Sequence, residues 1–255
     1  MDWTQVSYHY DGSFAGFLCC VFEAYLHKEA PACFLGPEDD RLSLWPERQV
    51  VTDESHAKRV YQSLDKKIGV RGRQLVVHGF LTCLPEKELP LWNFLRLGYE
   101  RGPGVVQDLT DDRVNTVTKA VLHLTKEAHL LKGFTRFSAQ DGLLIGEIEP
   151  KNRVLPLLRP HFCTRYARES FVLYDRTHKQ ALFYRPHQWA IVPLAEFHLD
   201  RPGQEELDYR RLWRRFYDTI AIEGRYNPKC RMTHMPKRYW GTMTEFQTEQ
   251  EGLPS

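Results

Sequence analysis

One stretch near the end of the chain combines cations with flat aromatic rings and contains no carboxylate. It spans residues 225–240. Cations displace counterions from phosphates and aromatic rings stack on bases, so this composition is typical of a nucleic-acid surface. The residues that we assign to nucleic-acid binding are Arg225, Asn227, Lys229, Arg231, His234, Lys237, Arg238, Tyr239 and Trp240.

Two Xaa-Pro pairs interrupt regular structure in this stretch. Asn227 precedes Pro228, and Met235 precedes Pro236. A residue before proline is pushed out of the helical region, so we predict an ordered loop with short helical turns. The alternative is a solvated basic tail that is held down by Trp240.

Four further side chains are candidates for acid–base chemistry: Asp11, His129, Glu147 and Glu149. Imidazole changes charge near neutral pH, and paired carboxylates serve as general acids and bases. Each group also has a structural alternative. The simpler interpretation of His129 is a half-buried hydrogen-bonding residue at a helix edge, and that of Glu147 is a cross-strand ion pair with Arg136.

Composition restricts where nucleic acid can bind. The 255 residues carry a net charge of only +2, so any contact with DNA must come from a local patch. Six cysteines are present, but none forms a C-x-x-C pair, and the three-cysteine cradle of a radical S-adenosylmethionine cluster is missing. We therefore predict no metal site and no cofactor, and the cysteine usage favours a reducing cytoplasm.

The N-terminus and the hydropathy pattern predict neither a signal peptide nor a membrane span. Residues 1–5 lack a basic region followed by an apolar one, and no apolar run approaches the length of a transmembrane helix. We expect a cytoplasmic protein.

The first half of the chain reads as mainly helical. Residues 6–10 alternate as a short strand, and Ser13 then caps a helix that begins at Phe14. Val50-Val51 is a possible strand, and Asp53 caps a helix that extends to Ile68. Further helices are predicted over residues 72–83, 86–99 and 110–133.

The second half reads as a sheet. Asp141-Gly142 is a favoured hairpin pair, which would place Gln140 opposite Leu143. A helix over 155–168 precedes three strands, at 171–175, 181–184 and 189–192, and an amphipathic helix over 205–223 leads into the basic aromatic stretch. The predicted fold is a single α+β domain over residues 1–246, in which a helical half precedes a mainly antiparallel sheet flanked by helices. Residues 247–255 are predicted to be a flexible tail.

Several segments resemble one bacterial protein family. They lie at residues 10–17, 128–137, 147–150, 155–162 and 227–240. The chain resembles proteins assigned to DNA metabolism or DNA repair that are usually encoded beside a radical S-adenosylmethionine protein. In some relatives a similar domain is fused to a uracil-DNA glycosylase-type domain. The resemblance implies DNA and the radical protein as partners, but no catalytic residue follows from it.

Three functions remain open from the sequence. The first is a DNA-binding accessory protein in DNA repair or modification, which acts with a separate radical S-adenosylmethionine enzyme. The second is an enzyme that acts on a modified nucleobase through Asp11, His129, Glu147 and Glu149, and it requires these groups to converge in one pocket. The third is a protein–protein adaptor whose basic stretch binds an acidic surface of a partner protein.

Overall fold

The computed structural model of the protein describes residues 3–140, 142–195, 197, 210, 212 and 235–243. Contacts within the chain divide it into two compact units, unit 1 over Met1–Leu124 and unit 2 over Thr125–Ser255. Each unit is described by itself. The boundary falls inside helix α4, whose residues up to Leu124 are treated with unit 1.

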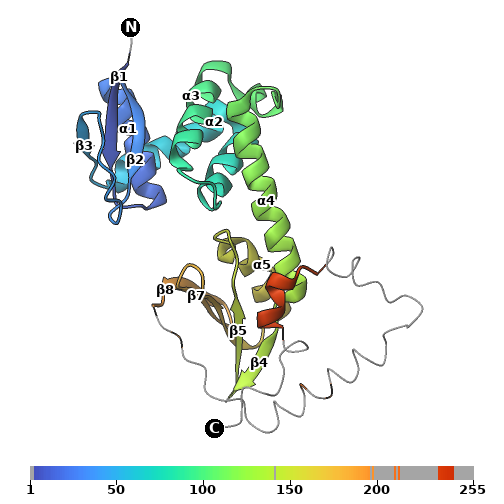
Figure 1. Ribbon diagram of the computed structural model, residues 1–255. Coiled ribbons are helices and arrows are strands. Elements are labelled where there is room, and N and C mark those ends of the chain that lie inside the picture. The colour runs from blue at the N-terminus through green and yellow to red at the C-terminus, as the bar shows by residue number, and fades with distance from the viewer. Residues whose placement is uncertain are drawn as a thin grey trace. The chain divides into compact units, whose positions relative to one another are not determined.

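Unit 1 combines a small sheet with a set of helices (Figure 1). Its elements are β1 (Thr4–His9), α1 (Phe14–His27), β2 (Glu29–Leu35), β3 (Glu47–Gln49), α2 (Glu54–Phe80), α3 (Glu88–Arg101), the 3-10 helix η1 (Pro103–Gln107) and the first part of α4 (Asp112–Phe134). The sheet has the order β2-β1-β3, and both pairings are parallel. Helix α1 supplies the crossover between β1 and β2, as a parallel pair requires.

Strand β2 was not predicted from the sequence, and β3 lies slightly earlier in the chain than the predicted strand. The register between β1 and β2 shifts where Val6 pairs with Pro31 and Ser7 pairs with Cys33. Proline lacks an N–H donor, so it is tolerated at such a bulge on an edge strand. The third strand ends at Gln49, just before the predicted Val50-Val51.

The helix starts of unit 1 follow the predicted caps. The Ser13 side chain accepts a hydrogen bond from the Gly16 N–H at 2.9 Å, and Asp53 Oδ1 accepts from the Ser55 and His56 N–H groups. Gly69 adopts φ 73° and ψ 170° inside α2, which divides it into the two helical segments that the sequence predicted. A positive φ strains residues that carry a Cβ, so glycine is favoured at this break.

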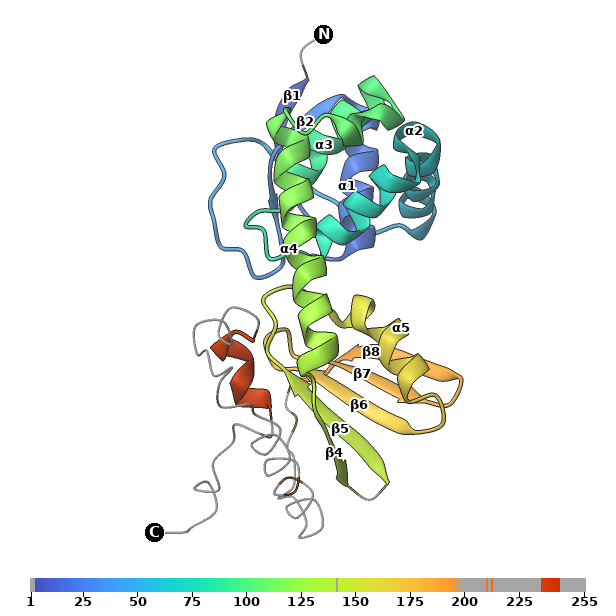
Figure 2. The ribbon, with the colours of Figure 1, turned by 90° about the vertical axis from the view of Figure 1, so that its right-hand side faces the viewer.

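Unit 2 is built on a five-stranded sheet (Figure 2). Its elements are the last part of α4, β4 (Phe137–Gln140), β5 (Leu143–Ile148), α5 (Leu155–Arg165), β6 (Ser170–Asp175), β7 (Gln180–Arg185), β8 (Gln188–Pro193) and the 3-10 helix η3 (Lys237–Thr242). The order is β4-β5-β6-β7-β8, with β5 and β6 parallel and the other pairs antiparallel. The predicted pairing of Gln140 with Leu143 is confirmed.

Aromatic side chains fill the space between α5 and the sheet of unit 2. The ring of Phe137 on β4 lies 5.3 Å from that of Phe162 on α5 and 5.6 Å from that of Phe171 on β6, between ring centroids. Such edge-to-face contacts add to the free energy gained by burying the rings. The parallel β5–β6 pair needs a crossover, and α5 provides it.

The predicted α+β class is confirmed, with helices that precede a mainly antiparallel sheet. The small parallel sheet of unit 1 is an addition. The single domain over 1–246 stays a prediction, and the tail at 247–255 lies outside the described residues, as does most of the helix predicted over 205–223. Among the residues that the structure describes, no helix combines the length and hydrophobicity needed to span a bilayer.

Candidate nucleic-acid interface

The described part of the basic aromatic stretch is the short helix η3, which lies beside the end of α4 in unit 2 (Figure 1). It contains four of the nine residues predicted to bind nucleic acid: Lys237, Arg238, Tyr239 and Trp240. The other five lie outside the described residues, and they are Arg225, Asn227, Lys229, Arg231 and His234.

Tyr239 is a core residue. Its side chain is buried, and its ring lies 5.5 Å from that of Phe134 on α4, between centroids. Burial raises the pKa of the Tyr239 phenol, and the neighbouring Arg238 guanidinium opposes this shift. Arg238 donates a hydrogen bond to the phenolic oxygen. This position fits a side chain that braces the loop better than one that stacks on a base.

Arg238 binds a carboxylate that the sequence analysis did not single out. Its Nη2 lies 3.3 Å from Oε1 of Glu127, and the Glu127 side chain is only 1% exposed. The same carboxylate accepts hydrogen bonds from the Lys151 N–H at 3.1 Å, the Asn152 N–H at 2.9 Å and the Asn152 Nδ2 at 2.6 Å. A buried carboxylate needs such partners, because an unpaired buried charge is costly.

The position of Glu127 on α4 was a usable signal. It comes three residues after Leu124 and four before Leu131, both of which are buried. Positions three and four apart share a helix face, so Glu127 had to be buried with them. A charged residue on an apolar helix face indicates a polar partner elsewhere in the chain.

Lys237 and Trp240 lie beside each other on η3. Lys237 is exposed, and its Nζ lies 5.8 Å from the ring centroid of Trp240. Trp240 is half-buried, and its Nε1 donates to the Met235 carbonyl at 3.1 Å. An ammonium group beside a held indole ring is a pairing suited to a phosphate and a base.

Another ring beside a cation lies on the sheet of unit 2, and this one is exposed. Trp189 on β8 is 52% exposed, and the Arg159 guanidinium of α5 lies 4.1 Å from its ring centroid. The sequence analysis treated Trp189 only as a strand residue. Its proximity to Arg159 depends on how α5 packs on the sheet, which no local pattern reveals.

The charge of the chain is divided unevenly between the units. Residues 125–255 contain 21 of the 35 Lys and Arg but only 16 of the 33 Asp and Glu. Residues 1–124 contain the other 14 Lys and Arg and the other 17 Asp and Glu. Unit 2 is therefore the cationic part of a molecule whose total charge is nearly neutral. A polyanion would be attracted to unit 2.

Among the four candidate acid–base groups, Asp11 and His129 have different local surroundings. Asp11 of unit 1 accepts from the Ser13 N–H at 2.9 Å and the Thr52 Oγ1 at 2.8 Å in the turn before α1. Burial tends to raise the pKa of Asp11, but the hydrogen bonds from Ser13 and Thr52 lower it overall. His129 of unit 2 is exposed on α4. It lies about 200° around the helix from Glu127, so it faces away from the carboxylate that η3 contacts.

Glu147 and Glu149 lie near each other at the end of β5. Burial raises the pKa of the half-buried Glu147, and the negative charge of Glu149 adds to this, while the positive charge of Arg176 opposes it. Glu149 Oε1 pairs with Arg176 Nη1 at 3.0 Å. The predicted ion pair between Arg136 and Glu147 stays a prediction. No three His, Cys, Asp or Glu side chains within the described residues are grouped so that they could hold a metal ion.

A family model described as a domain of unknown function, DUF4130, matches residues 85–245, which is more than half of the chain. The chain belongs to this family. No curated protein matches it. The DUF4130 region contains α3, η1, α4 and all of the described elements of unit 2. Glu127, Arg238 and Trp240 therefore lie inside the DUF4130 region, and Asp11 lies before it.

Proposed function

We propose that the chain binds DNA through the basic aromatic stretch and serves as an accessory protein in DNA repair or modification. The observation that carries this proposal is that neighbouring side chains of η3 lie in different surroundings. Arg238 and Tyr239 hold the helix on α4, while the neighbouring Lys237 is exposed and lies beside the ring of Trp240. A recognition group that is fixed before binding loses less conformational entropy when its ligand arrives.

Lys237 and Trp240 have distinct roles in the proposed complex. Lys237 neutralises a backbone phosphate and releases a counterion, which makes the affinity depend on salt. The face of Trp240 stacks on a base, a contact worth about 1–3 kcal/mol that tolerates any sequence. The cation surplus of unit 2 adds long-range attraction.

A radical S-adenosylmethionine enzyme on a separate chain is the proposed companion. Its support is the family resemblance described from the sequence, together with the absence from this sequence of the three-cysteine cradle. In this arrangement the accessory chain holds the DNA and the companion carries out the chemistry. Co-purification of the two proteins that survives nuclease treatment would test the association independently of DNA.

The proposal is tested by measuring DNA affinity against salt concentration for single-stranded and duplex DNA. Lys237→Ala should reduce the slope of log affinity against log salt by about one phosphate contact. Trp240→Leu should weaken single-strand binding by about 1–3 kcal/mol, whereas Trp240→Phe keeps a stacking ring and should lose less. Lys66→Ala, which removes an exposed cation from unit 1, is the matched control.

Two outcomes would contradict the proposal. One is an unchanged salt slope in Lys237→Ala, which would mean that this ammonium group contacts no phosphate. The other is no DNA binding by the full chain together with nuclease-resistant capture of an acidic protein, which would select the adaptor function instead.

A further inference from the structure

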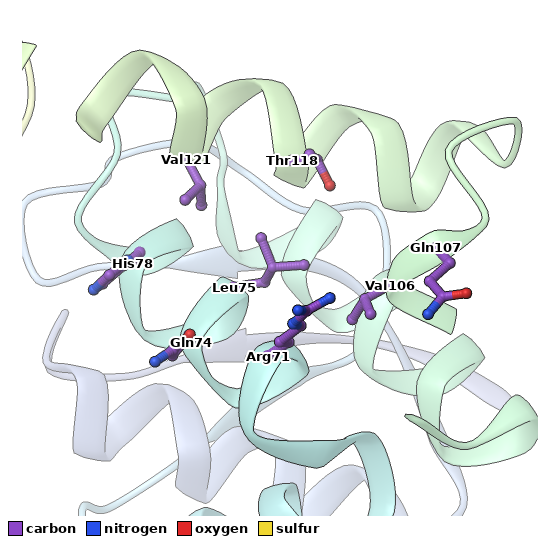
Figure 3. A pocket seen from close by; sticks show the side chains of 8 residues that line it. All are labelled: Arg71, Gln74, Leu75, His78, Val106, Gln107, Thr118 and Val121. Atoms are coloured by element: carbon purple, nitrogen blue, oxygen red, sulfur yellow. The ribbon is translucent and has the colours of Figure 1, made fainter. Parts of the chain in front are cut away.

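Unit 1 contains a pocket that lies outside the basic aromatic stretch. It has a volume of about 380 Å³, is open to solvent and is lined by residues of α2, η1 and α4 (Figure 3). Small-molecule sites in proteins range from about 300 to 1,000 Å³, so this pocket is large enough for a small organic ligand. In Figure 3, Thr118 and Val121 of α4 face Arg71 and Leu75 of α2 across the pocket.

The polar groups of the pocket come from three elements. Arg71, Gln74 and His78 are spaced three, four and seven residues apart on α2, so they share one helix face. Gln107 of η1 and Thr118 of α4 complete the set. Folding of all three elements is therefore needed to assemble the pocket.

These polar side chains have no partner within the part of the chain that the structure describes. Arg71, Gln74 and Gln107 are exposed, and water satisfies them in the absence of a ligand. The Thr118 Oγ1 differs, because it is buried and finds no hydrogen-bond partner among the described residues. A buried hydroxyl without a partner is destabilising, so it requires an explanation. Threonine has two accessible χ1 rotamers in a helix, so this hydroxyl can turn toward a ligand at small cost.

The side chains that line the pocket favour a ligand with an anionic group and a planar ring. It contains the Arg71 guanidinium and no carboxylate. Burial lowers the pKa of His78, so at neutral pH the imidazole is uncharged and offers one donor and one acceptor. The two glutamine amides add both kinds of group, and such mixed donors and acceptors match the edge of a nucleobase. Leu75, Val106 and Val121 provide the apolar surface on which a ring can lie.

We propose that this pocket binds a nucleoside monophosphate, with its phosphate on Arg71 and its base against the aliphatic side chains. The glutamine amides and His78 contact the base edge, and Thr118 supplies one further hydrogen bond. This site is separate from the DNA interface, and it would remain if DNA binding were disproved.

Titration calorimetry on the full chain tests the site with three kinds of probe: nucleoside monophosphates, the matching nucleosides, and inorganic phosphate. We expect saturable binding of at least one monophosphate, at least tenfold tighter than either its nucleoside or phosphate alone. Arg71→Met should weaken this binding at least tenfold, whereas Lys66→Met, which removes an exposed cation from the same helix, should not. Lys237→Ala should also leave it unchanged, because η3 is not part of the pocket.

Thr118→Val gives a second readout that a purely structural role would not produce. Valine has nearly the same shape and helix propensity as threonine. The ligand-free variant should melt at a higher temperature, because a buried unpaired hydroxyl becomes a methyl group, while its affinity for the monophosphate should fall about fivefold. No saturable binding of any monophosphate, or binding that neither Arg71→Met nor Thr118→Val weakens, would overturn the proposal.

Discussion

The guanidinium of Arg238 reaches the buried carboxylate of Glu127, with Nη2 3.3 Å from Oε1. The two residues lie far apart in the sequence, and their contact fixes η3 to α4. Glu127 also receives hydrogen bonds from Lys151 and Asn152, which immediately follow Glu149 and Pro150 after β5. One carboxylate thus connects three segments of unit 2.

Glu127→Gln should destabilise unit 2. In the variant, the NH₂ of the amide replaces one of the two oxygens that accept hydrogen bonds from Lys151 and Asn152. Arg238 also loses the negative charge that it pairs with. The expected loss in free energy of unfolding is about 2–4 kcal/mol, measured by denaturant titration. Glu149→Gln removes an exposed carboxylate that pairs with Arg176, so it should change the same quantity by less than about 1 kcal/mol. Equal effects of the two substitutions would contradict a connecting role for Glu127.

Two substitutions at Tyr239 separate its ring from its hydroxyl. Tyr239→Phe keeps the contact with Phe134 and removes the acceptor for Arg238, which should cost about 1 kcal/mol. Tyr239→Ala also removes the buried ring and should cost about 3–5 kcal/mol. Thermal unfolding measures both. If the alanine variant melts no lower than the phenylalanine variant, the ring is not part of the core.

Glu29 should make unit 1 sensitive to acid. Its carboxylate accepts from the Tyr8 hydroxyl at 2.7 Å and from Arg48 Nε at 2.8 Å. Burial alone would raise the pKa of Glu29, but these hydrogen bonds and the charge of Arg48 lower it overall. A carboxyl group with a lowered pKa stabilises the folded state at pH values above its ordinary pKa of about 4.3. This stabilisation is lost as the pH falls through the lower pKa of the folded state. Unfolding measured across this range should show a flatter acid limb for Glu29→Gln than for the unchanged protein.

Glu147 should have the opposite pH dependence. Its pKa is raised by burial, so the folded state holds the proton more tightly than the unfolded state does. Stability then falls as the pH rises from about 4.3 through the raised pKa. The Glu147→Gln side chain stays neutral at every pH, so this variant avoids the cost of a buried charge. Its free energy of unfolding, compared with that of the unchanged protein, should therefore be more favourable at pH 7 than at pH 4. Denaturant titrations of both proteins at the two pH values check this. If the free energy of unfolding of the variant differs from that of the unchanged protein by the same amount at both pH values, the raised pKa is contradicted.

The features that the sequence predicted correctly depend on neighbouring residues. Ser13 and Asp53 cap helices through bonds to N–H groups two or three positions away. The pairing of Gln140 with Leu143 follows from a two-residue turn in which Gly142 has a φ of 78°. Such features are encoded within a few residues, so their composition and spacing reveal them.

The features that the sequence did not predict depend on distant partners. Strand β2 contains Pro31 and begins at Glu29, a charged residue that is buried only because Tyr8 and Arg48 bind it. The burial of Tyr239 was not predicted either, because it depends on the ring of Phe134, which lies far away in the sequence. The pocket in unit 1 needs three elements together, so no single segment of the sequence indicates it.

The anchoring of η3 also bears on how the protein can be handled. A chain that ended before residue 235 would keep the sheet and α5, but the carboxylate of Glu127 would lose its guanidinium and the Phe134 ring its aromatic neighbour. Newly exposed apolar surface of this kind promotes aggregation. Trimming the C-terminus to obtain a smaller fragment should therefore lower solubility rather than improve it.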